Sequence, residues 1–264
     1  GAQLPFLERL ISGKEDSTKK AEIHAWHYHD DQLVKNKGEF SEAPAGSIAI
    51  IDIDNPILKH DNCGDPGSIS LAGIISRADQ DSRISSILLR IDSPGGQVSG
   101  LQTFTDAITA CHKPIFAFIN DGMAASAAYW IAACCNEIWS SHATNAVGSI
   151  GVYTRLADQS KQLSLQGIEV HEIYADQSSE KNGRYRDALK GNYSELKKDL
   201  NFTANTFIKA VRINRSEKLS FTADNDPFKG KLFNSIDALE NGLIDKIGSF
   251  QECTQALQQF TNSN

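Results

Sequence analysis

Residues 84–96 carry the sequence ISSILLRIDSPGG, an apolar, β-branched run that ends abruptly in a polar turn. The run from Ile84 to Ile91 is typical of a buried strand. The turn after it holds Pro94, Gly95 and Gly96. Consecutive glycines at the carboxyl end of a parallel strand free backbone N–H groups to point into the crevice where α/β folds bind ligands. An isolated Pro-Gly-Gly is more often a plain tight turn into the next helix, so both interpretations stay open here.

Strands and helices alternate around this stretch. Apolar β-branched runs predict strands at 48–53, 84–91, 115–119, 138–140 and 168–174. Apolar residues at helical spacing predict helices at 70–78, 98–111, 123–135 and 193–215. The alternation indicates βαβ units around a mostly parallel sheet, and therefore the α/β class. We expect a polar N-terminal arm over 1–45, order from Ser47, and one domain over 46–264 that includes a long amphipathic oligomerisation helix over 192–215.

Composition excludes several classes of protein. The net charge of −7 leaves no basic footprint for nucleic acid. The apolar run at 123–135 is shorter than the roughly 20 residues of a membrane span, and no signal-peptide pattern opens the sequence. Five irregularly spaced cysteines favour a reducing compartment. We therefore expect a cytoplasmic protein, or a membrane-associated one if an anchor precedes this sequence.

Three histidines cluster near the N-terminus, at His24, His27 and His29. Such spacing is compatible with a metal site, but no carboxylate or cysteine partner completes a recognisable ligand pattern. We expect no metal there and a partly packed arm instead.

A second stretch with chemical potential is DGMAASAAYW at residues 121–130. Ser126 lies at the start of the predicted apolar helix, where free N–H groups and the helix dipole stabilise a developing anion. A serine among alanines is more often just a small residue that lets helices pack. Neither this stretch nor the glycine turn alone indicates an enzyme.

Together, in this order, the two stretches closely resemble the serine–lysine peptidases of the signal peptide peptidase A family, whose fold is shared with Clp protease and crotonase. The matching segments are 84–100, 113–136, 148–153 (GSIGVY) and 238–248 (ALENGLIDKIG). The resemblance implies a Clp/crotonase-like ββα superhelix with a mostly parallel sheet and a C-terminal helical extension. The Ala127-Ala128 pair after the serine looks most similar to the phage capsid-assembly protease branch (protein C-like).

The resemblance also implies roles for individual residues. Ser126 matches the nucleophile, Gly96 and Ala127 match the oxyanion-hole residues, and Ser149 matches the serine that orients the base. The family's base is a lysine, for which Lys181 and the Arg186 position compete. An arginine keeps its proton in proteins. Lys181 lies 55 residues after Ser126, near the family's gap, so we expect it to be the base.

These roles imply a serine endopeptidase that needs neither cofactor nor metal. Its substrates would be polypeptides: phage scaffold or capsid proteins, or signal-peptide-like and unfolded segments. We expect a ring-like homo-oligomer in which Lys181 completes the site of a neighbouring copy. The alternative is a monomer or dimer in which Lys181 folds back onto the Ser126 of its own chain. A crotonase-like acyl-CoA enzyme and a catalytically silent structural relative in a capsid assembly are the alternative functions.

Overall fold

The computed structural model describes residues 25–36, 40–62 and 65–263. Its centre is a nine-stranded sheet, whose strands run in the order β2-β1-β3-β4-β5-β6-β9. The strands of this path are Gln32–Lys35 (β2), Ala25–His29 (β1), Ser47–Asp54 (β3), Ile84–Ser93 (β4), Ile115–Ala125 (β5), Glu137–Ser140 (β6) and Lys246–Ile247 (β9). From β3 to β9 every pairing is parallel. Two short strands, β7 (Ala146–Gly148) and β8 (Leu232–Asn234), extend the end of β5.

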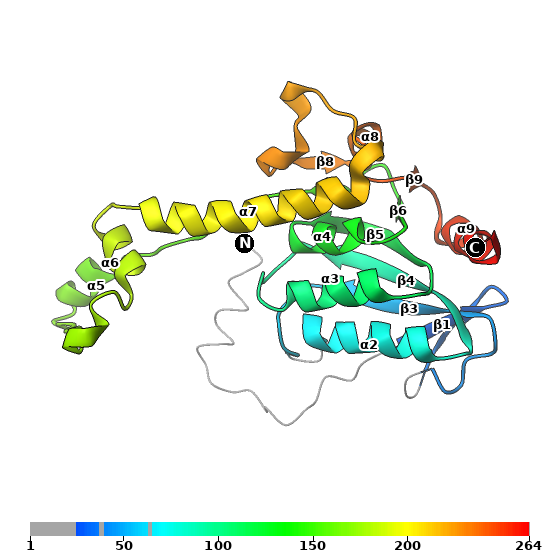
Figure 1. Ribbon diagram of the computed structural model, residues 1–264, viewed down its shortest axis with the longest axis horizontal. Helices are drawn as coiled ribbons and strands as arrows, with labels where there is room; N and C mark the ends of the chain where they lie inside the picture. Colours follow the sequence, from blue (N-terminus) through cyan, green and yellow to red (C-terminus); the bar gives the residue numbers. More distant parts are fainter. Residues whose placement is uncertain (1–24, 37–39, 63–64, 264) are drawn as a thin grey trace.

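Helices cover both faces of this sheet (Figure 1). On one face lie α2 (Ser68–Gln80), α3 (Leu101–Ala110) and α4 (Ala127–Ala133), which pack on inward side chains such as Leu89 and Ile91. On the other face, α9 (Phe250–Ser263) packs on Leu88 and Phe116. Neighbouring strand residues point to opposite faces, which is why one apolar run such as 84–91 feeds two cores. The α/β class and the mostly parallel sheet are therefore as the sequence predicts.

A separate lobe stands away from the sheet at the far end of the long helix α7 (Ser194–Arg215), as Figure 1 shows. This distal lobe (residues 151–193) contains α5 (Ser160–Leu165) and α6 (Gly183–Leu189). Another short helix, α8 (Ser235–Glu240), follows β8. The predicted helix over 193–215 is confirmed, and it is the stalk that joins the lobe to the sheet.

Three expectations about secondary structure need correction. The helix predicted over 123–135 begins only at Ala127, because residues 123–125 pair with β7 as the end of β5. The strand predicted over 168–174 is extended chain that pairs with no strand of the described residues. Order begins before Ser47, since β1 and β2 form a hairpin whose first strand pairs with β3. The division of the chain after residue 45 stays a prediction.

The histidine cluster is only partly visible. His24 lies outside the described residues, while the buried His27 shares a 2.7 Å hydrogen bond between its Nδ1 and Asn36 Oδ1. Within the described residues no group of three or more His, Cys, Asp and Glu side chains could hold a metal ion. In that same part of the chain, no helix is long and apolar enough to cross a membrane.

Candidate active site

The glycine turn after β4 and the serine after β5 meet at one point of the structure. β4 and β5 run parallel, and at their ends Ser93 pairs with Ala124. A Cβ atom added to Gly95 would lie 2.8 Å from Ser126 Cβ and 2.8 Å from the Ala127 nitrogen. The two stretches that the sequence singled out are therefore in direct contact.

Ser126 has an unusual backbone conformation. It caps α4 with backbone angles φ 53° and ψ −121°, a conformation that residues other than glycine rarely adopt. Two hydrogen bonds hold it there: the Ser126 amide donates to Gly148 O at 2.8 Å, and the Trp130 amide donates to Ser126 O at 3.0 Å. Its half-buried side chain thus stands at the sharp turn from strand to helix, beside the first amides of α4.

Two backbone amides at this point have no hydrogen-bond acceptor among the described residues: those of Gly96 and Ala127. Ile57 binds the chain on both sides of Gly96, because its amide donates to Gly95 O and its carbonyl accepts from the Gln97 amide, both at 2.8 Å. This pattern leaves the Gly96 amide free. The Ala127 amide is free because it opens α4. Gly95, next to Gly96, contacts Ser126 and Ala127, so both unpaired N–H groups belong to the segments that meet at this serine. Backbone N–H groups without an acceptor are the kind of donor that an oxyanion hole uses.

Ser149 lies next to Ser126 through the pairing of β5 with β7. It follows Gly148, whose carbonyl accepts the Ser126 amide, and it also has a left-handed backbone, with φ 51°. Its own amide donates to Lys231 O at 2.8 Å. The structure thus brings Gly96, Ser126, Ala127 and Ser149 to one place.

Lys181 is not part of this cluster within one chain. It lies in the turn before α6, exposed, in a hollow of about 410 Å³ that it shares with Glu172 and Tyr174. α7 contacts α4 through the stacked rings of Phe207 and Trp130, 4.7 Å apart. Figure 1 shows that the lobe joins α7 at its other end. That end, Ser194, precedes Phe207 by 13 residues, which is about 20 Å along the helix at 1.5 Å per residue. Among the described residues, no hydrogen bond or ion pair connects 160–190 to the residues around Ser126.

Arg186, the competing position, has partners of its own. Its Nη2 donates to Ser179 O, and its guanidinium lies 4.6 Å from the centre of the Tyr174 ring. Both contacts brace the turn that carries Lys181. They give Arg186 a structural task that needs no loss of its proton.

Ser93 and Ile57 support the site and were not predicted as functional residues. The buried Ser93 Oγ accepts from the Gly95 amide at 3.2 Å and donates to Asn55 O at 2.5 Å, so it holds the glycine turn in shape. A serine two residues before a glycine in a turn is a recognised local pattern, and it could have identified Ser93. Ile57 acts across 38 residues through its backbone alone, so no local pattern marks it.

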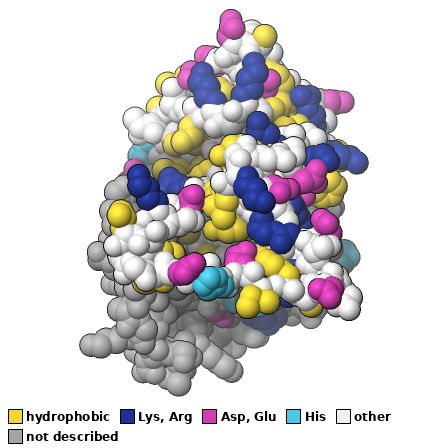
Figure 2. Space-filling model, turned by 90° about the vertical axis from the view of Figure 1, so that its left-hand side faces the viewer, with side chains coloured by type: hydrophobic (Ala, Val, Ile, Leu, Met, Phe, Trp, Pro, Cys, Tyr) yellow, Lys and Arg dark blue, Asp and Glu magenta, His cyan; other side chains and the backbone are white. Residues whose placement is uncertain are grey.

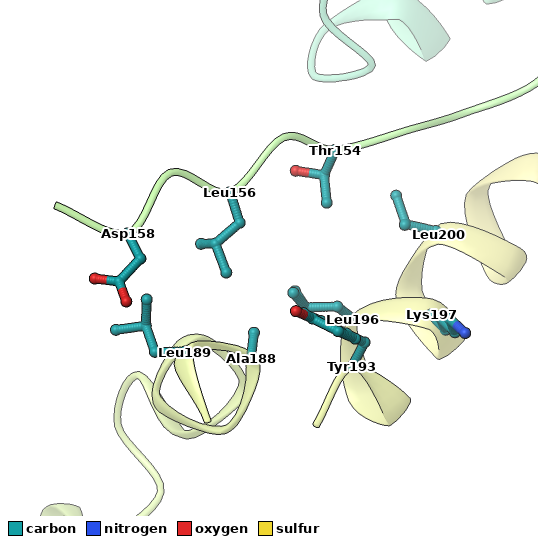
Figure 3. Close-up of a pocket in the computed structure, with 9 residues that line it drawn as sticks. All are labelled: Thr154, Leu156, Asp158, Ala188, Leu189, Tyr193, Leu196, Lys197 and Leu200. Atoms are coloured by element: carbon teal, nitrogen blue, oxygen red, sulfur yellow. The ribbon is translucent and has the colours of Figure 1, made fainter. Parts of the chain in front are cut away.

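The second hollow of the lobe is larger, about 460 Å³, and lies between the extended chain after β7, α6 and the start of α7 (Figure 3). Leu156, Leu189 and Leu196 point into it, with Asp158 at one end. Ser126 lines neither hollow. The lobe therefore offers an apolar surface apart from the serine site.

Comparison with known proteins decides the family. Residues 107–263, more than half of the chain, match peptidase family S49. The chain belongs to peptidase family S49. The match includes Ser126, Ala127, Ser149 and Lys181 but begins after the glycine turn.

Relatives of this S49 chain come from bacteria, from phages and from the archaeon Methanocaldococcus jannaschii. It is 24% identical to "Protease 4" of Haemophilus influenzae over 81% of its own length and 35% of that protein. It is 28% identical to "Capsid assembly protease C" of Escherichia phage lambda over 76% of its length and 46% of that protein. The chain thus spans less than half of each of these relatives. The resemblance to the signal peptide peptidase A family is confirmed, and its phage branch is among the relatives.

Solved structures show the fold of this S49 chain. A mutant of the "1510-N membrane-bound stomatin-specific protease" superposes with a TM-score of 0.52 at 17% identity, covering 81% of this chain and 84% of the other. An "enoyl-CoA hydratase/carnithine racemase from Magnetospirillum magneticum" does so with a TM-score of 0.50 at 13% identity, covering 90% and 76%. The Clp/crotonase-like fold is therefore confirmed.

Proposed function

We propose that the protein is a serine endopeptidase in which Ser126 attacks the peptide carbonyl and Lys181 of a second copy accepts the serine proton. The observation that carries this proposal is the contact between the left-handed Ser126 and the glycine turn, which sets a hydroxyl beside the two unpaired amides of Gly96 and Ala127. A nucleophile next to preorganised donors is the arrangement that acyl transfer needs.

Each residue then has one task. Ser126 Oγ forms the bond to the substrate carbonyl carbon while its proton passes to the lysine amine. The Gly96 and Ala127 amides hold the oxyanion, and each such donor is typically worth about 10² or more in rate. The ammonium then protonates the leaving amine, and water hydrolyses the acyl-enzyme. Ser149, one residue from the Ser126 backbone partner, orients the lysine.

A second copy is needed because Lys181 lies in the turn before α6 on the distal lobe, whereas Ser126 caps α4 on the sheet. Figure 1 shows α6 well separated from α4. A lysine acts as a base only when its amine is neutral, and burial at an interface favours that form. The lobe and the adjoining helix expose large apolar side chains: Ile173 is 93% exposed, Leu165 81% and Phe202 76%. Figure 2 shows apolar, basic and acidic side chains interspersed on the side of the molecule to which the lobe points. An apolar surface of this kind, with both charge signs, is suited to binding another copy in a ring-like oligomer.

The substrate is proposed as a polypeptide that reaches the site unfolded. A relative named as a capsid assembly protease supports phage scaffold or capsid proteins as one source, and a relative named as a putative signal peptide peptidase supports signal-peptide-like or unfolded segments as the other. All four described cysteines are free thiols, which supports a reducing compartment such as the cytoplasm.

Two other functions are outcomes of the test. An acyl-CoA enzyme shares this fold and would use the same glycine amides without needing Ser126 or Lys181. A silent structural relative would keep the fold and show no turnover. Both predict that Ser126 does not react covalently.

The test is covalent labelling with a fluorophosphonate, with the labelled residue located by mass spectrometry, together with hydrolysis of an apolar fluorogenic peptide. We expect the label on Ser126, and no hydrolysis by Ser126→Ala or Lys181→Ala. Lys190→Ala, which removes another exposed lysine of the same lobe, should keep wild-type activity. Arg186→Ala should keep much of it. Wild-type turnover by Ser126→Ala would overturn the nucleophile, and an essential Arg186 with a dispensable Lys181 would overturn the base.

A further inference from the structure

The register between β4 and β5 breaks just before the site. The two strands pair residue for residue up to Ile91 and Ile119, and the next pair is Ser93 with Ala124. Two steps along β4 thus match five steps along β5, so β5 bulges over residues 120–123. Within this bulge, Asp121 has a left-handed backbone with φ 50°. Bulges of this kind redirect a strand, here immediately before Ser126.

The side chain of Asp92 closes this bulge from the neighbouring strand. Its Oδ1 accepts a hydrogen bond from the Met123 amide at 3.0 Å. It also lies so close to Gly122 that a Cβ added there would be 1.9 Å from Oδ1. Gly122 has no Cβ, and the carboxylate occupies the space that one would take.

We propose that Asp92 is a positioning residue for the reaction: by fixing the bulge of β5, it sets the distance between the Gly96 amide on one strand end and Ser126 with Ala127 on the other. This inference rests on the proposed function. The physical reason is that the two oxyanion donors follow different strands, Gly96 after β4 and Ala127 after β5. The distance between these donors therefore depends on the register between the two strands. Asp92 lies between Ile91 and Ser93, where that register changes.

The role requires an acceptor oxygen and no charge. Asp92→Asn keeps an oxygen for the Met123 amide, whereas Asp92→Ala removes it. Asp54 provides a matched control. It is paired with Asp92 on β3, and its exposed carboxylate interacts with neighbouring groups through charge alone and makes no hydrogen bond among the described residues. Asp54→Ala therefore removes one negative charge at the same carboxyl end of the strands and leaves the bulge of β5 intact.

The experiment measures kcat and KM on a fluorogenic peptide, the rate at which a fluorophosphonate labels Ser126, and hydrogen–deuterium exchange of the peptide covering 120–127. For Asp92→Ala we expect kcat and the labelling rate to fall roughly 30-fold, within the 10²-fold range of a 1 Å misplacement. KM should stay unchanged, and exchange over 120–127 should rise. Asp92→Asn should recover most of the activity, and Asp54→Ala should match the wild type.

A double-mutant cycle with Gly122→Ala gives a second, independent readout. The new Cβ displaces the carboxylate, so Gly122→Ala alone should slow the enzyme about as much as Asp92→Ala. The double variant should be no slower than Asp92→Ala, because the clash disappears with the carboxylate.

The inference is overturned if Asp92→Ala keeps wild-type exchange over 120–127, or if Asp92→Asn is as slow as Asp92→Ala. A failure of the proposed function has another signature: the wild type itself is then not labelled at Ser126. In that case the exchange of Asp92→Ala against Asp92→Asn and Asp54→Ala still decides whether the carboxylate fixes the bulge.

Discussion

At the scale of single residues, the site is made by backbone conformations that side chains ordinarily avoid. Gly95, Ser126, Gly148 and Ser149 all have positive φ, and they gather where β4, β5 and β7 end. Each such residue other than glycine costs on the order of 1–3 kcal/mol. The surrounding hydrogen bonds of Ile57 and Gly148 hold this strained arrangement in place.

Gly95→Ala tests the contact between the two turns. We expect a loss of at least about 10² in kcat/KM, since an added Cβ would meet Ala125 O at 2.7 Å and Ser126 Cβ at 2.8 Å and would move the nucleophile. Gly46→Ala is the matched control, because Gly46 also has positive φ, but nothing lies within 4 Å of an added Cβ. Kinetics of both variants on one peptide substrate provide the measurement. Equal activity of the two variants would contradict the contact.

Ser126→Gly separates strain from chemistry. Glycine adopts positive φ without the penalty of an L side chain, so Ser126→Gly should be more stable than Ser126→Ala by about 1 kcal/mol, while both are inactive. Urea unfolding of the two variants measures this difference. A Ser126→Gly protein that is the less stable of the two would show that the left-handed backbone carries no strain.

At the scale of elements, α7 is fixed to the sheet by a buried ion pair at its C-terminal end. Arg215 is 1% exposed and bonds to Asp245 through Nη1 at 2.7 Å and Nη2 at 3.1 Å. Burial alone would raise the pKa of Asp245, but the hydrogen bonds and the charge of Arg215 outweigh burial and lower this pKa. The ion pair thus fixes the end of α7 that is opposite to the lobe.

The lowered pKa sets the sign of a pH dependence. A carboxyl whose pKa is lower in the folded state stabilises the fold above its unfolded pKa of about 3.9 and loses that contribution as pH falls through the folded value. We expect the stability of the wild type to fall below about pH 4 in part through Asp245. Asp245→Asn should lower the free energy of unfolding by about 3–5 kcal/mol at neutral pH, because it leaves Arg215 buried without its counter-charge.

The measurement is urea unfolding of the wild type and Asp245→Asn between acid and neutral pH. The control is Asp237→Asn in α8, because the Asp237 carboxylate accepts a hydrogen bond from the neutral side chain of Asn234 at the surface. The difference between wild type and Asp245→Asn should shrink as the solution becomes acidic. A difference that is constant with pH would contradict the assigned ion pair.

The sequence predicts the elements that its apolar pattern marks and misses those that depend on distant partners. Ile84–Ile91 and the helix to Arg215 are predicted within a few residues. The alanine-rich run from Met123 favours a helix locally. Its first three residues, 123–125, instead pair with β7 and are part of the sheet. The stretch 168–174 alternates like a strand but has no strand beside it in the described chain.

The candidate site divides in the same way. Gly96, Ser126 and Ser149 follow from motifs, and the structure brings them together, although their roles stay predictions. Ile57 could not be predicted, because it acts through its backbone across the sheet. The sequence favours Lys181 through its spacing from Ser126 and through the permanent charge of Arg186, but neither argument predicts that Lys181 lies on a lobe away from the sheet.

At the scale of the whole molecule, Ser126 lies where β5 meets α4 on the sheet, and Lys181 lies on the distal lobe. The stalk helix α7 separates this lobe from the sheet (Figure 1). The central claim is that the two residues act together only between copies. Mixing inactive Ser126→Ala with inactive Lys181→Ala tests this claim most directly, provided that subunit exchange is demonstrated with differently labelled copies. In a closed ring of head-to-tail contacts, about a quarter of the sites in an equal mixture join an intact serine to an intact lysine. The account predicts that peptide hydrolysis returns to about that fraction of the wild-type rate, whereas mixed oligomers that stay inactive at every ratio would contradict it.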